Sequence, residues 1–362
     1  MAEGIEAKQE KTMKKILLII SCTILALGTS CGPNMIRLYF LRGGHRVWLC
    51  SFLESCGFPI ILIPLFISYI HRRRSAAATQ SAKVKMVLIE PPLFLASLVL
   101  GLISGLNNFC FAFGVARLPV TTSSLILATQ LAFNALFSFL LVRQKFRVYS
   151  VNTIFLLTVA AGILAMHSSG DRPSGEKSKQ YVLGFVITVM VAVLDGFIYP
   201  LVELVYKKVK QTINYSLVLE VQFVMCLFAS FFNIIGMIVN NDFKLISSEA
   251  RQFEHGEVVY CIVLVGIAIL SQCLLLGAIG VVFCASSLLS GVIVAAILPV
   301  TEILAVIFFK EKFNAEKGVA LILSLWGFAT YFYGESKHAK KMKKNVSLAE
   351  AEVPQVLLIS NP

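Results

Sequence analysis

The sequence predicts an all-α integral membrane protein of ten transmembrane helices, arranged as two inverted five-helix repeats. Of its 362 residues, 57% are hydrophobic and only 14% are charged. Apolar stretches of about 20 residues, each long enough to cross a bilayer as a helix, recur along the whole chain. The second half also repeats the first at a fixed offset of 167 residues. Because soluble domains carry roughly 25% charged residues, this composition excludes an ordinary globular enzyme.

Ten apolar spans follow one another along the chain. They cover residues 15–40, 47–70, 92–114, 120–142, 149–168, 181–206, 215–240, 257–280, 286–309 and 316–334. The first span follows basic residues but has no small-residue cleavage site, and it aligns with the sixth span. We therefore expect a mature helix at this position and not a signal peptide.

Identical residues in the two halves define the repeat. Five pairs lie 167 positions apart: Pro33 and Pro200, Tyr39 and Tyr206, Ser123 and Ser290, Lys145 and Lys312, Phe146 and Phe313. An odd number of helices per repeat makes the second half insert upside down, and transporters form substrate sites where such repeats face each other. The predicted organisation is a cytosolic tail (1–14), a first repeat (15–168), an external linker (169–180), a second repeat (181–335) and a cytosolic tail (336–362).

The basic residues predict the orientation of the chain in the membrane. The net charge is +12, and with a cytosolic N-terminus the inner segments hold 20 of the 32 Lys and Arg residues. The run Arg72-Arg73-Arg74 makes one inner loop strongly basic. The basic loop 43–46 would lie outside, against this rule, so the opposite topology stays open as an alternative. The charge distribution predicts cytosolic termini and requires no nucleic-acid partner.

The sequence lacks the motifs of a metal site or an enzyme. All nine cysteines lie inside apolar spans without CxxC spacing, so we expect them to be small buried hydrophobes. The sequence has no Gly-rich phosphate loop, no HExxH motif and no Ser/His/Asp arrangement. No Lys or Arg falls deep in a span, which argues against a carrier of phosphorylated solutes because phosphates need fixed positive charge. We expect no cofactor, no metal and no catalytic residue.

Amides inside the spans are the first candidates for substrate binding. Gln130 and Asn134 lie four residues apart in the fourth span and therefore share one helix face. Asn107 lies inside the third span. Polar side chains in a bilayer usually face a cavity or a partner, and an amide offers both donors and acceptors to a heterocycle. The alternative is that these amides hold neighbouring helices together.

An acidic and aromatic stripe marks the sixth span. Asp195, Tyr199 and Glu203 recur every four residues, and Pro200 interrupts the backbone beside them. A carboxylate in a low-dielectric cavity has its neutral form favoured, which suits it to coupling transport to a proton gradient. Glu203 and Asp195 are therefore proton-coupling candidates. Alternatively, Glu203 lies near the cytosolic end of the span and only pairs with Lys207.

Three further side chains are candidates for the site. Glu54, in the outer third of the second span, is a candidate proton relay, or it satisfies backbone groups at the kink near Pro59. Glu302 follows Pro299 in the ninth span, and a broken helix at a repeat interface is typical of a binding site. Trp48 can stack on a flat ring, although a Trp at a span boundary is more often an interfacial anchor.

Long blocks of this sequence resemble the plant purine permeases, a family within the drug/metabolite transporter superfamily. The matching blocks are RLYF (37–40), GGHRVWL (43–49), ESCGFPI (54–60), residues 118–146, YPLVEL (199–204), residues 298–313 and residues 316–335. The resemblance implies the drug/metabolite transporter fold and proton-coupled uptake of adenine-like bases, cytokinins and related heterocyclic alkaloids or vitamins. It also implies a location in the plasma membrane of a plant cell, with both termini cytosolic.

The same resemblance indicates which residues form the central cavity. Carried over by motif position, they are Trp48, Glu54, Gln130, Asn134, Tyr199 and Glu203. The sequence also departs from the family pattern, because Asn107-Asn108 replaces a pair that often includes Asp, and Asp195 stands where an aromatic or apolar residue is usual. We therefore expect that an acid has moved from the third span to the sixth.

The combined prediction is a proton-coupled importer of purine-like compounds that works by alternating access. The predicted substrate-binding set is Gln130, Asn134, Asn107, Tyr199, Trp48 and Glu203, and the predicted proton-coupling set is Glu203, Glu54, Asp195 and Glu302. The expected partners are the heterocyclic substrate, protons and the lipid bilayer, without an obligate protein partner. The alternatives are a carrier of another small organic solute, a membrane receptor without transport and a membrane-embedded enzyme.

Overall fold

The computed structural model is built of helices, and the residues it describes include no strand. It describes residues 2–78, 86–118, 129–143, 148–167, 178–209 and 213–309, with isolated positions in 119–128, at 211 and in 315–337. The helices are α1 (Ala2–Leu41), α2 (Val47–Ser55), η1 (Phe58–Ile61), α3 (Leu62–Ala78), α4 (Pro91–Arg117), α6 (Gln130–Val142), α7 (Val148–His167), α8 (Ser178–Lys208), α9 (Tyr215–Val239), α10 (Asp242–Gln252), α11 (Gly256–Cys284) and α12 (Ser287–Phe309).

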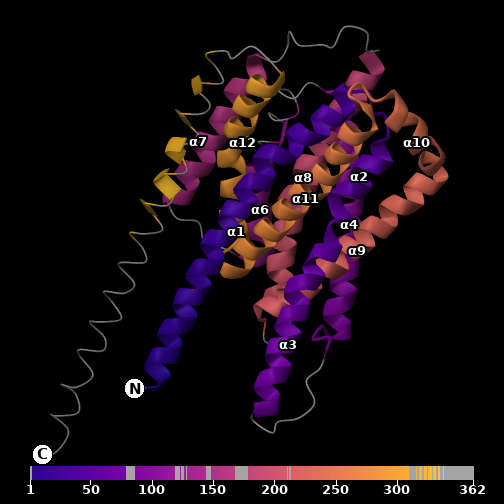
Figure 1. Cartoon of the computed structure of the whole chain (residues 1–362). Coiled ribbons are helices and arrows are strands. Elements are labelled where there is room, and N and C mark those ends of the chain that lie inside the picture. The colour runs from indigo at the N-terminus through magenta and orange to yellow at the C-terminus, as the bar shows by residue number, and fades with distance from the viewer. Residues whose placement is uncertain are drawn as a thin grey trace, which may run out of the picture.

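Most of the helices run side by side along the length of the molecule (Figure 1). Within the described residues, seven stretches are long and apolar enough to cross a membrane: Thr12–Leu41, Val47–Arg74, Pro91–Arg117, Val182–Lys208, Tyr215–Val239, Gly256–Cys284 and Ser287–Phe308. They correspond to predicted spans one, two, three, six, seven, eight and nine. Helix α1 begins earlier than the first predicted span, at Ala2.

The other three predicted spans are covered only in part. The fourth is represented by α6 and the fifth by α7, which contribute shorter apolar helices at Gln130–Val142 and Val148–Ala160. The tenth span, the linker 169–180 and the tail 336–362 lie mostly outside the described residues. The total of ten helices and their division into two repeats therefore stay predictions.

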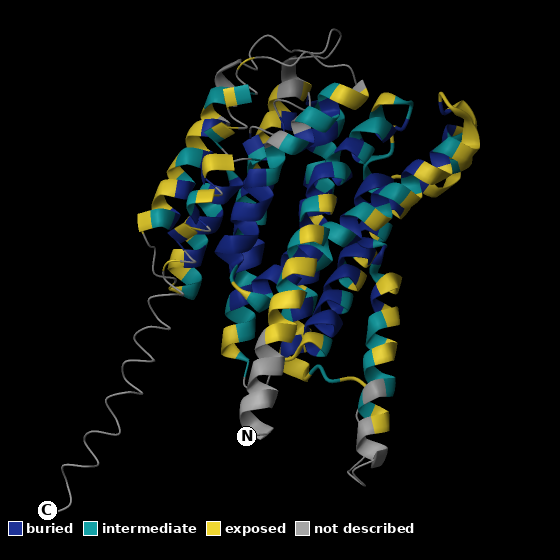
Figure 2. Cartoon of the chain, turned by 60° about the vertical axis from the view of Figure 1, so that its left-hand side comes forward, coloured by how far each residue is buried: buried dark blue, intermediate teal, exposed yellow. Residues whose placement is uncertain are grey.

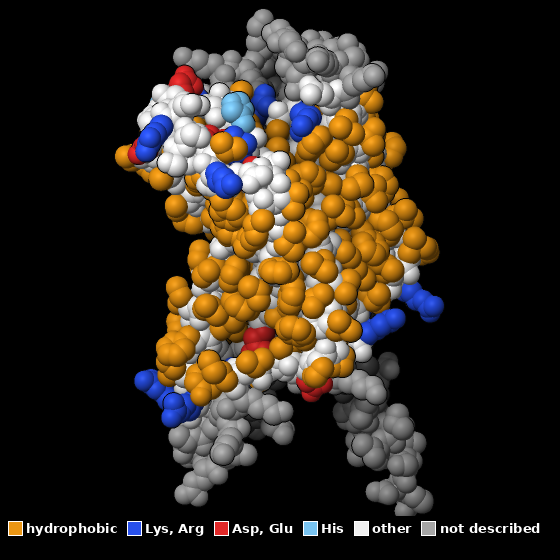
Figure 3. All heavy atoms as spheres, turned by 90° about the vertical axis from the view of Figure 1, so that its right-hand side faces the viewer, with side chains coloured by type: hydrophobic (Ala, Val, Ile, Leu, Met, Phe, Trp, Pro, Cys, Tyr) orange, Lys and Arg blue, Asp and Glu red, His pale blue; other side chains and the backbone are white. Residues whose placement is uncertain are grey.

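Hydrophobic side chains cover the flank of the molecule between its two ends. In Figure 3 a broad hydrophobic surface separates the Lys and Arg side chains near the top from those near the bottom. Large apolar side chains point outward, such as Ile63 (63% exposed) and Phe231 (57% exposed). The buried residues gather on the helix faces that are turned inward (Figure 2). An apolar surface of this extent requires a lipid environment, so the chain is a multi-pass membrane protein.

Prolines accompany the division of the second predicted span into two α-helices with a short 3-10 helix between them. α2 ends at Ser55, η1 has Pro59 in its first turn, and Pro64 lies in the first turn of α3. Proline has no N–H group, and it is tolerated in a first turn because the N–H groups there have no helical partner. The break leaves Glu54 in the last turn of α2.

The helix pairs follow the repeat in the sequence. α1 packs on α11 and α12, and α8, its counterpart in the second half, packs on α4 and α6. Likewise α4 packs on α9 and α11 packs on α2. Small residues allow close helix contact in membranes. A Cβ at Gly28 would lie 2.7 Å from Leu274 Cα, and one at Gly101 would lie 2.6 Å from the Met225 carbonyl oxygen.

A buried carboxylate joins three helices at the end of the molecule that carries α10. Glu249 of α10 accepts hydrogen bonds from the hydroxyl groups of Tyr39 at 2.5 Å and Tyr260 at 3.1 Å. Arg46 lies 3.4 Å from the same carboxylate and 3.8 Å from that of Asp242. Burial raises the pKa of Asp242, and the positive charge of Arg46 opposes this shift. The contacts of Glu249 with Tyr39 and Tyr260 thus hold α10 against the C-terminal end of α1 and the N-terminal end of α11.

Candidate functional site

A cavity of about 140 Å³ lies among α1, α2, α4, α6, α8, α11 and α12. Its polar lining residues are Thr29, Glu54, Ser104, Asn107, Asn108, Gln130, Asp195, Tyr199 and Ser271. One water molecule needs roughly 10–15 Å³, so the cavity has room for about ten waters or for a bicyclic ring of about ten non-hydrogen atoms. The helices that supply these residues belong to both halves of the chain.

An amide and an acid from different halves meet on the lining. Asn107 of α4 donates a hydrogen bond from Nδ2 to Oδ1 of Asp195 on α8 at 2.8 Å. The structure thus brings together two residues that the sequence analysis singled out separately. The Oδ1 atom of Asn107 is buried and has no hydrogen-bond partner in the described part of the chain. The pair therefore leaves one carbonyl oxygen available to a molecule in the cavity.

Two further polar atoms of lining residues are buried without a partner among the described residues. They are Oε1 of Glu54 and Nδ2 of Asn108. Leaving a buried polar group without a hydrogen bond costs about 1–3 kcal/mol, and native proteins usually pair such groups with protein atoms or water. Together with the free oxygen of Asn107, these atoms indicate a site that is built for a polar ligand.

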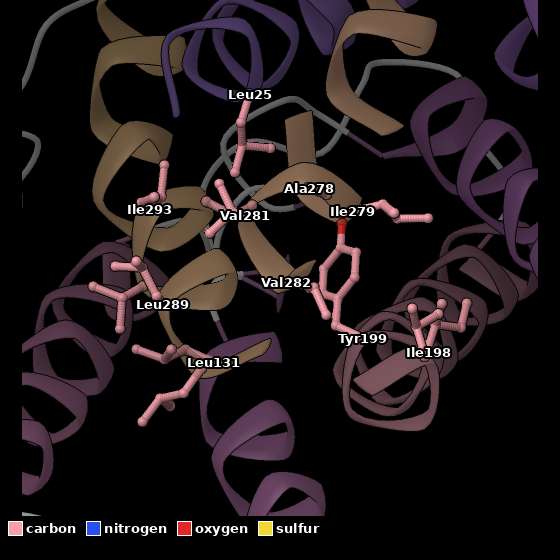
Figure 4. Packing of buried hydrophobic residues seen from close by; sticks show 14 of the residues in the cluster. Leu25, Leu131, Ile198, Tyr199, Ala278, Ile279, Val281, Val282, Leu289 and Ile293 are labelled. Atoms are coloured by element: carbon pink, nitrogen blue, oxygen red, sulfur yellow. The ribbon is translucent and has the colours of Figure 1, made fainter. Parts of the chain in front are cut away.

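Gln130 and Tyr199 also line the cavity. Gln130 is buried at the start of α6. Tyr199 belongs to the large apolar cluster that also includes residues of α6, α11 and α12, and its ring points toward Ala278 and Ile279 (Figure 4). Phe111, one turn beyond Asn107, lies on the lining as well. Phe111 is missing from the predicted site, although its spacing of four residues from Asn107 places both on one face of α4.

Asn134 and Glu203 lie outside the described lining. Asn134 is fully buried, donates to the carbonyl oxygen of Ser287 at 3.1 Å and accepts from Ser138 at 3.2 Å. Oε2 of Glu203 accepts from the backbone N–H of Ser287 at 2.8 Å and from its hydroxyl group at 2.5 Å. Oε1 of Glu203 lies 2.8 Å from Nζ of Lys207. Both side chains therefore fix the start of α12, in agreement with the two alternatives that the sequence left open for them.

Trp48 is also separate from the described lining. Its ring stacks on Phe109 of α4 with centroids 3.9 Å apart, and it packs where Gly236 of α9 has no side chain. Trp48 therefore holds α2 against α4 and α9. The side chain of Glu302 lies outside the described residues, so its predicted role stays a prediction.

The charged side chains of the described cavity lining are all acidic. This lining contains two acids, Glu54 and Asp195, and neither Lys nor Arg. A phosphorylated ligand would lack the fixed positive charge that it needs. In the described part of the chain, no group of three His, Cys, Asp or Glu side chains is arranged to hold a metal ion. The described lining therefore favours a polar ligand without a phosphate group.

Comparisons with known proteins identify the family. The profile of a family described as purine nucleobase transmembrane transport matches residues 16–341. Purine permease 3 of Arabidopsis thaliana is 49% identical over 350 residues, which cover 97% of this chain and 99% of the relative. The chain belongs to the purine permease family. Purine permease 2 of the same plant is 48% identical and covers 91% of this chain and 95% of its own.

More distant relatives agree with this membership. Probable purine permease 5 of Arabidopsis thaliana is 36% identical over 89% of this chain and 86% of its own. A solved crystal structure, described only as 'Crystal structure of protein', has a similar fold with a TM-score of 0.58. The match covers 87% of this chain and 98% of the other chain. Its sequence is 16% identical, so the likeness concerns the fold alone. The predicted resemblance to purine permeases is confirmed, and the helical membrane architecture is that of a transporter family.

Proposed function

We propose that this purine permease imports purine bases and purine-like heterocycles, adenine and cytokinins among them, together with protons. Transport would proceed by alternating access of ten helices, arranged as two inverted repeats around the cavity. Family membership supports the substrate class, and the matching helix pairs of the two halves support the repeat. The observation that carries the proposal is a cavity lining that combines two acids, aromatic rings and polar atoms that have no hydrogen-bond partner among the described residues.

The polar lining offers hydrogen bonds that match the edge of a purine. Oδ1 of Asn107 would accept from an N–H group, and Nδ2 of Asn108 would donate to a ring nitrogen. Gln130 supplies a donor and an acceptor on another wall. The rings of Phe111 and Tyr199 would pack on the flat faces of the base. Asn134 and Trp48 would support this site through helix packing.

Asp195 and Glu54 are the proposed proton carriers, in place of Glu203. Both line the cavity, whereas the two oxygens of Glu203 are engaged by Ser287 and Lys207. Acids that face a cavity inside the membrane are typical elements of a proton relay. Each proton that enters with a purine would draw on about 2.3 kcal/mol per 100 mV of membrane potential.

We further propose a plasma-membrane location with both termini cytosolic. The N-terminal end of α1 and the C-terminal end of α3, which carries Arg72 to Arg74, lie at the end of the molecule opposite α10 (Figure 1). A cytosolic surface enriched in basic residues follows the positive-inside rule. The proposal requires no cofactor and no protein partner.

Uptake by liposomes that contain the purified protein tests the proposal. Labelled adenine should accumulate when the outside is acidic, and a protonophore should abolish the accumulation. Gln130→Ala should raise the KM roughly 2- to 12-fold, because a hydrogen bond contributes about 0.5–1.5 kcal/mol. Gln252→Ala, on the exposed surface of α10, is the matched control and should leave the KM unchanged.

The variants Glu54→Gln and Asp195→Asn separate substrate binding from coupling. A carrier that has lost its proton-coupling acid should still exchange labelled for unlabelled adenine but should not concentrate it in response to a pH gradient. Adenine binding without any uptake would indicate a receptor and would overturn the proposed transport. Uptake that ignores the pH gradient in the unmodified protein would overturn the proton coupling alone.

A further inference from the structure

A second cavity, of about 540 Å³, lies on the flank of the molecule between α3, α4 and α9. We call it the α3 groove. One wall is formed by α3 with Leu65, Phe66 and Tyr69, and the other includes Phe94 of α4 and Phe223 of α9. Phe66 is 60% exposed and Phe94 is 39% exposed, so the walls are open to the surroundings of the protein. The α3 groove is therefore an apolar depression that faces the lipid. It shares no lining residue with the central cavity.

The position of α3 explains why the groove exists. α3 makes its main contacts with η1 and α9, and its C-terminal part extends away from the other helices (Figure 1). The segment before α4 is held against α9, because Oε2 of Glu220 accepts from the backbone N–H groups of Leu88 at 2.7 Å and Ile89 at 2.9 Å. These hydrogen bonds hold the wall opposite α3 in place. The carboxylate of Glu220 on this wall is already hydrogen-bonded to two backbone N–H groups.

One end of the α3 groove is positively charged. Arg72 lines the groove one turn beyond Tyr69, and its buried Nε has no hydrogen-bond partner in the part of the chain that the structure describes. Arg73 and Arg74 follow it and are exposed. A guanidinium group presents several N–H donors in a fork that matches a phosphate group. The α3 groove thus combines apolar walls, which suit an acyl chain, with an arginine, which suits a phosphate group. A phospholipid carries both of these groups.

We propose that the α3 groove binds an anionic phospholipid from the leaflet at the end of the molecule where α1 begins. One acyl chain would lie between Phe66 and Phe94, and the phosphate group would accept hydrogen bonds from Arg72 and Tyr69. Charge complementarity selects this occupant, because the three consecutive arginines attract a negatively charged headgroup. A zwitterionic lipid of the same chain length fits the apolar walls equally well but gains less from the arginines.

Lipid binding to the purified full-length protein in detergent tests this site. Native mass spectrometry would count bound dioleoyl phosphatidylserine and dioleoyl phosphatidylcholine at equal concentrations. We expect retention of phosphatidylserine in preference to phosphatidylcholine. Arg72→Gln should weaken phosphatidylserine binding about fivefold, the value for one basic residue near an anionic surface. Arg74→Gln, which removes the same charge from an exposed position outside the described lining, is the matched control and should have a smaller effect.

A variant that fills the groove provides a second test of the lipid site. Leu65→Trp should fill the groove and reduce phosphatidylserine binding, and unchanged adenine uptake by this variant would show that it is folded. If Leu65→Trp is not folded, the comparison of Arg72→Gln with Arg74→Gln decides alone. Equal retention of the two lipids, or equal losses in the two arginine variants, would overturn the proposal. Inorganic phosphate that displaces the lipid completely would also overturn it, because the site would then recognise an anion without its acyl chain.

Discussion

The chemistry of the central cavity depends on single side chains that meet across helices. The sequence predicts that an acid has moved from the third span, which here carries Asn107, to Asp195 on the sixth. In the structure these two residues share a hydrogen bond of 2.8 Å. An acid at either position would therefore lie at the same place on the cavity lining, and the predicted exchange stays a prediction.

Exchange of the two residues tests this interpretation. The double variant Asn107→Asp/Asp195→Asn should keep the acid–amide pair and most of the adenine uptake. Asn107→Asp alone places two acids face to face, and Asp195→Asn alone removes the acid. In a pH gradient, each single variant should lose roughly 10- to 150-fold in uptake efficiency, because a hydrogen bond to a charged group contributes about 1.5–3 kcal/mol. Initial rates of labelled adenine uptake measure the effect, and a double variant as inactive as the single variants would contradict it.

At the scale of elements, a polar cluster near the start of α12 holds three helices together. Glu203 of α8 and Asn134 of α6 both bind Ser287, the first residue of α12. The first N–H groups of a helix have no partner within it, and a carboxylate satisfies them and interacts favourably with the helix dipole. A Cβ at Gly291 of α12 would collide with the Asn134 amide, so this glycine allows α6 and α12 to approach closely.

Glu203→Gln should therefore act on stability more than on coupling. We expect a loss of about 1.5–3 kcal/mol in stability, because a buried hydrogen-bonded charge is replaced by a weaker acceptor. The pH dependence of the remaining adenine uptake should stay unchanged. Thermal unfolding in detergent and uptake at several pH values measure the two effects. A changed pH profile at normal stability would return Glu203 to the proton-coupling set.

An exposed ion pair provides the contrast for this variant. Glu254 lies 2.8 Å from Arg42, and both side chains are largely exposed. The hydrogen bond from Arg42 lowers the pKa of Glu254, so the pair contributes stability above the ordinary carboxyl value of about 4.3 and loses it as the pH falls. Water screens such pairs strongly. Glu254→Gln should therefore leave thermal unfolding at neutral pH unchanged within error.

Glycines set the distance between the long helices. Gly101 lies where α4 crosses α9, and an added Cβ would lie 2.6 Å from the Met225 carbonyl oxygen and 3.0 Å from Phe228 Cβ. Gly101→Val should destabilise the protein by about 1–3 kcal/mol, because overpacking forces neighbouring groups apart. Gly162→Val on α7 is the control, since an added Cβ there meets nothing within 4 Å. Thermal unfolding of both variants in detergent measures the difference, and equal stability would contradict the close crossing.

At the scale of the whole molecule, the two ends differ in structure. One end carries α10 and the buried cluster around Glu249. The other end carries the beginning of α1 and the end of α3 (Figure 1). The proposed alternating access would expose the central cavity first at one of these ends and then at the other. The direction of uptake then depends on which end faces the cytosol.

Labelling of introduced cysteines determines this direction. Lys244→Cys lies on the exposed surface of α10, and Arg74→Cys lies at the exposed end of α3. A membrane-impermeant maleimide should label Lys244→Cys in intact cells and Arg74→Cys only after permeabilisation. The unmodified protein with its nine cysteines gives the background. The reverse pattern would show that the positive-inside rule fails for this chain.

The sequence by itself determined the membrane class, the seven apolar segments that form candidate membrane-spanning helices and the family. Hydrophobic length is a local property, because each span must satisfy its backbone hydrogen bonds within its own helix. Motif blocks are local as well, so the resemblance to purine permeases required no coordinates. The amides and acids of the site were also found in this way, because polar side chains are rare within apolar spans.

Only the tertiary structure decided which of these polar side chains reach the cavity. Gln130 and Asn134 share a helix face, yet they lie about 6 Å apart along the axis. Gln130 lines the cavity, whereas Asn134 meets α12 where Gly291 leaves room for it. Glu203 likewise lies outside the described lining and binds Ser287 of α12. The difference depends on partners from distant parts of the chain, and spacing along one helix carries no information about them.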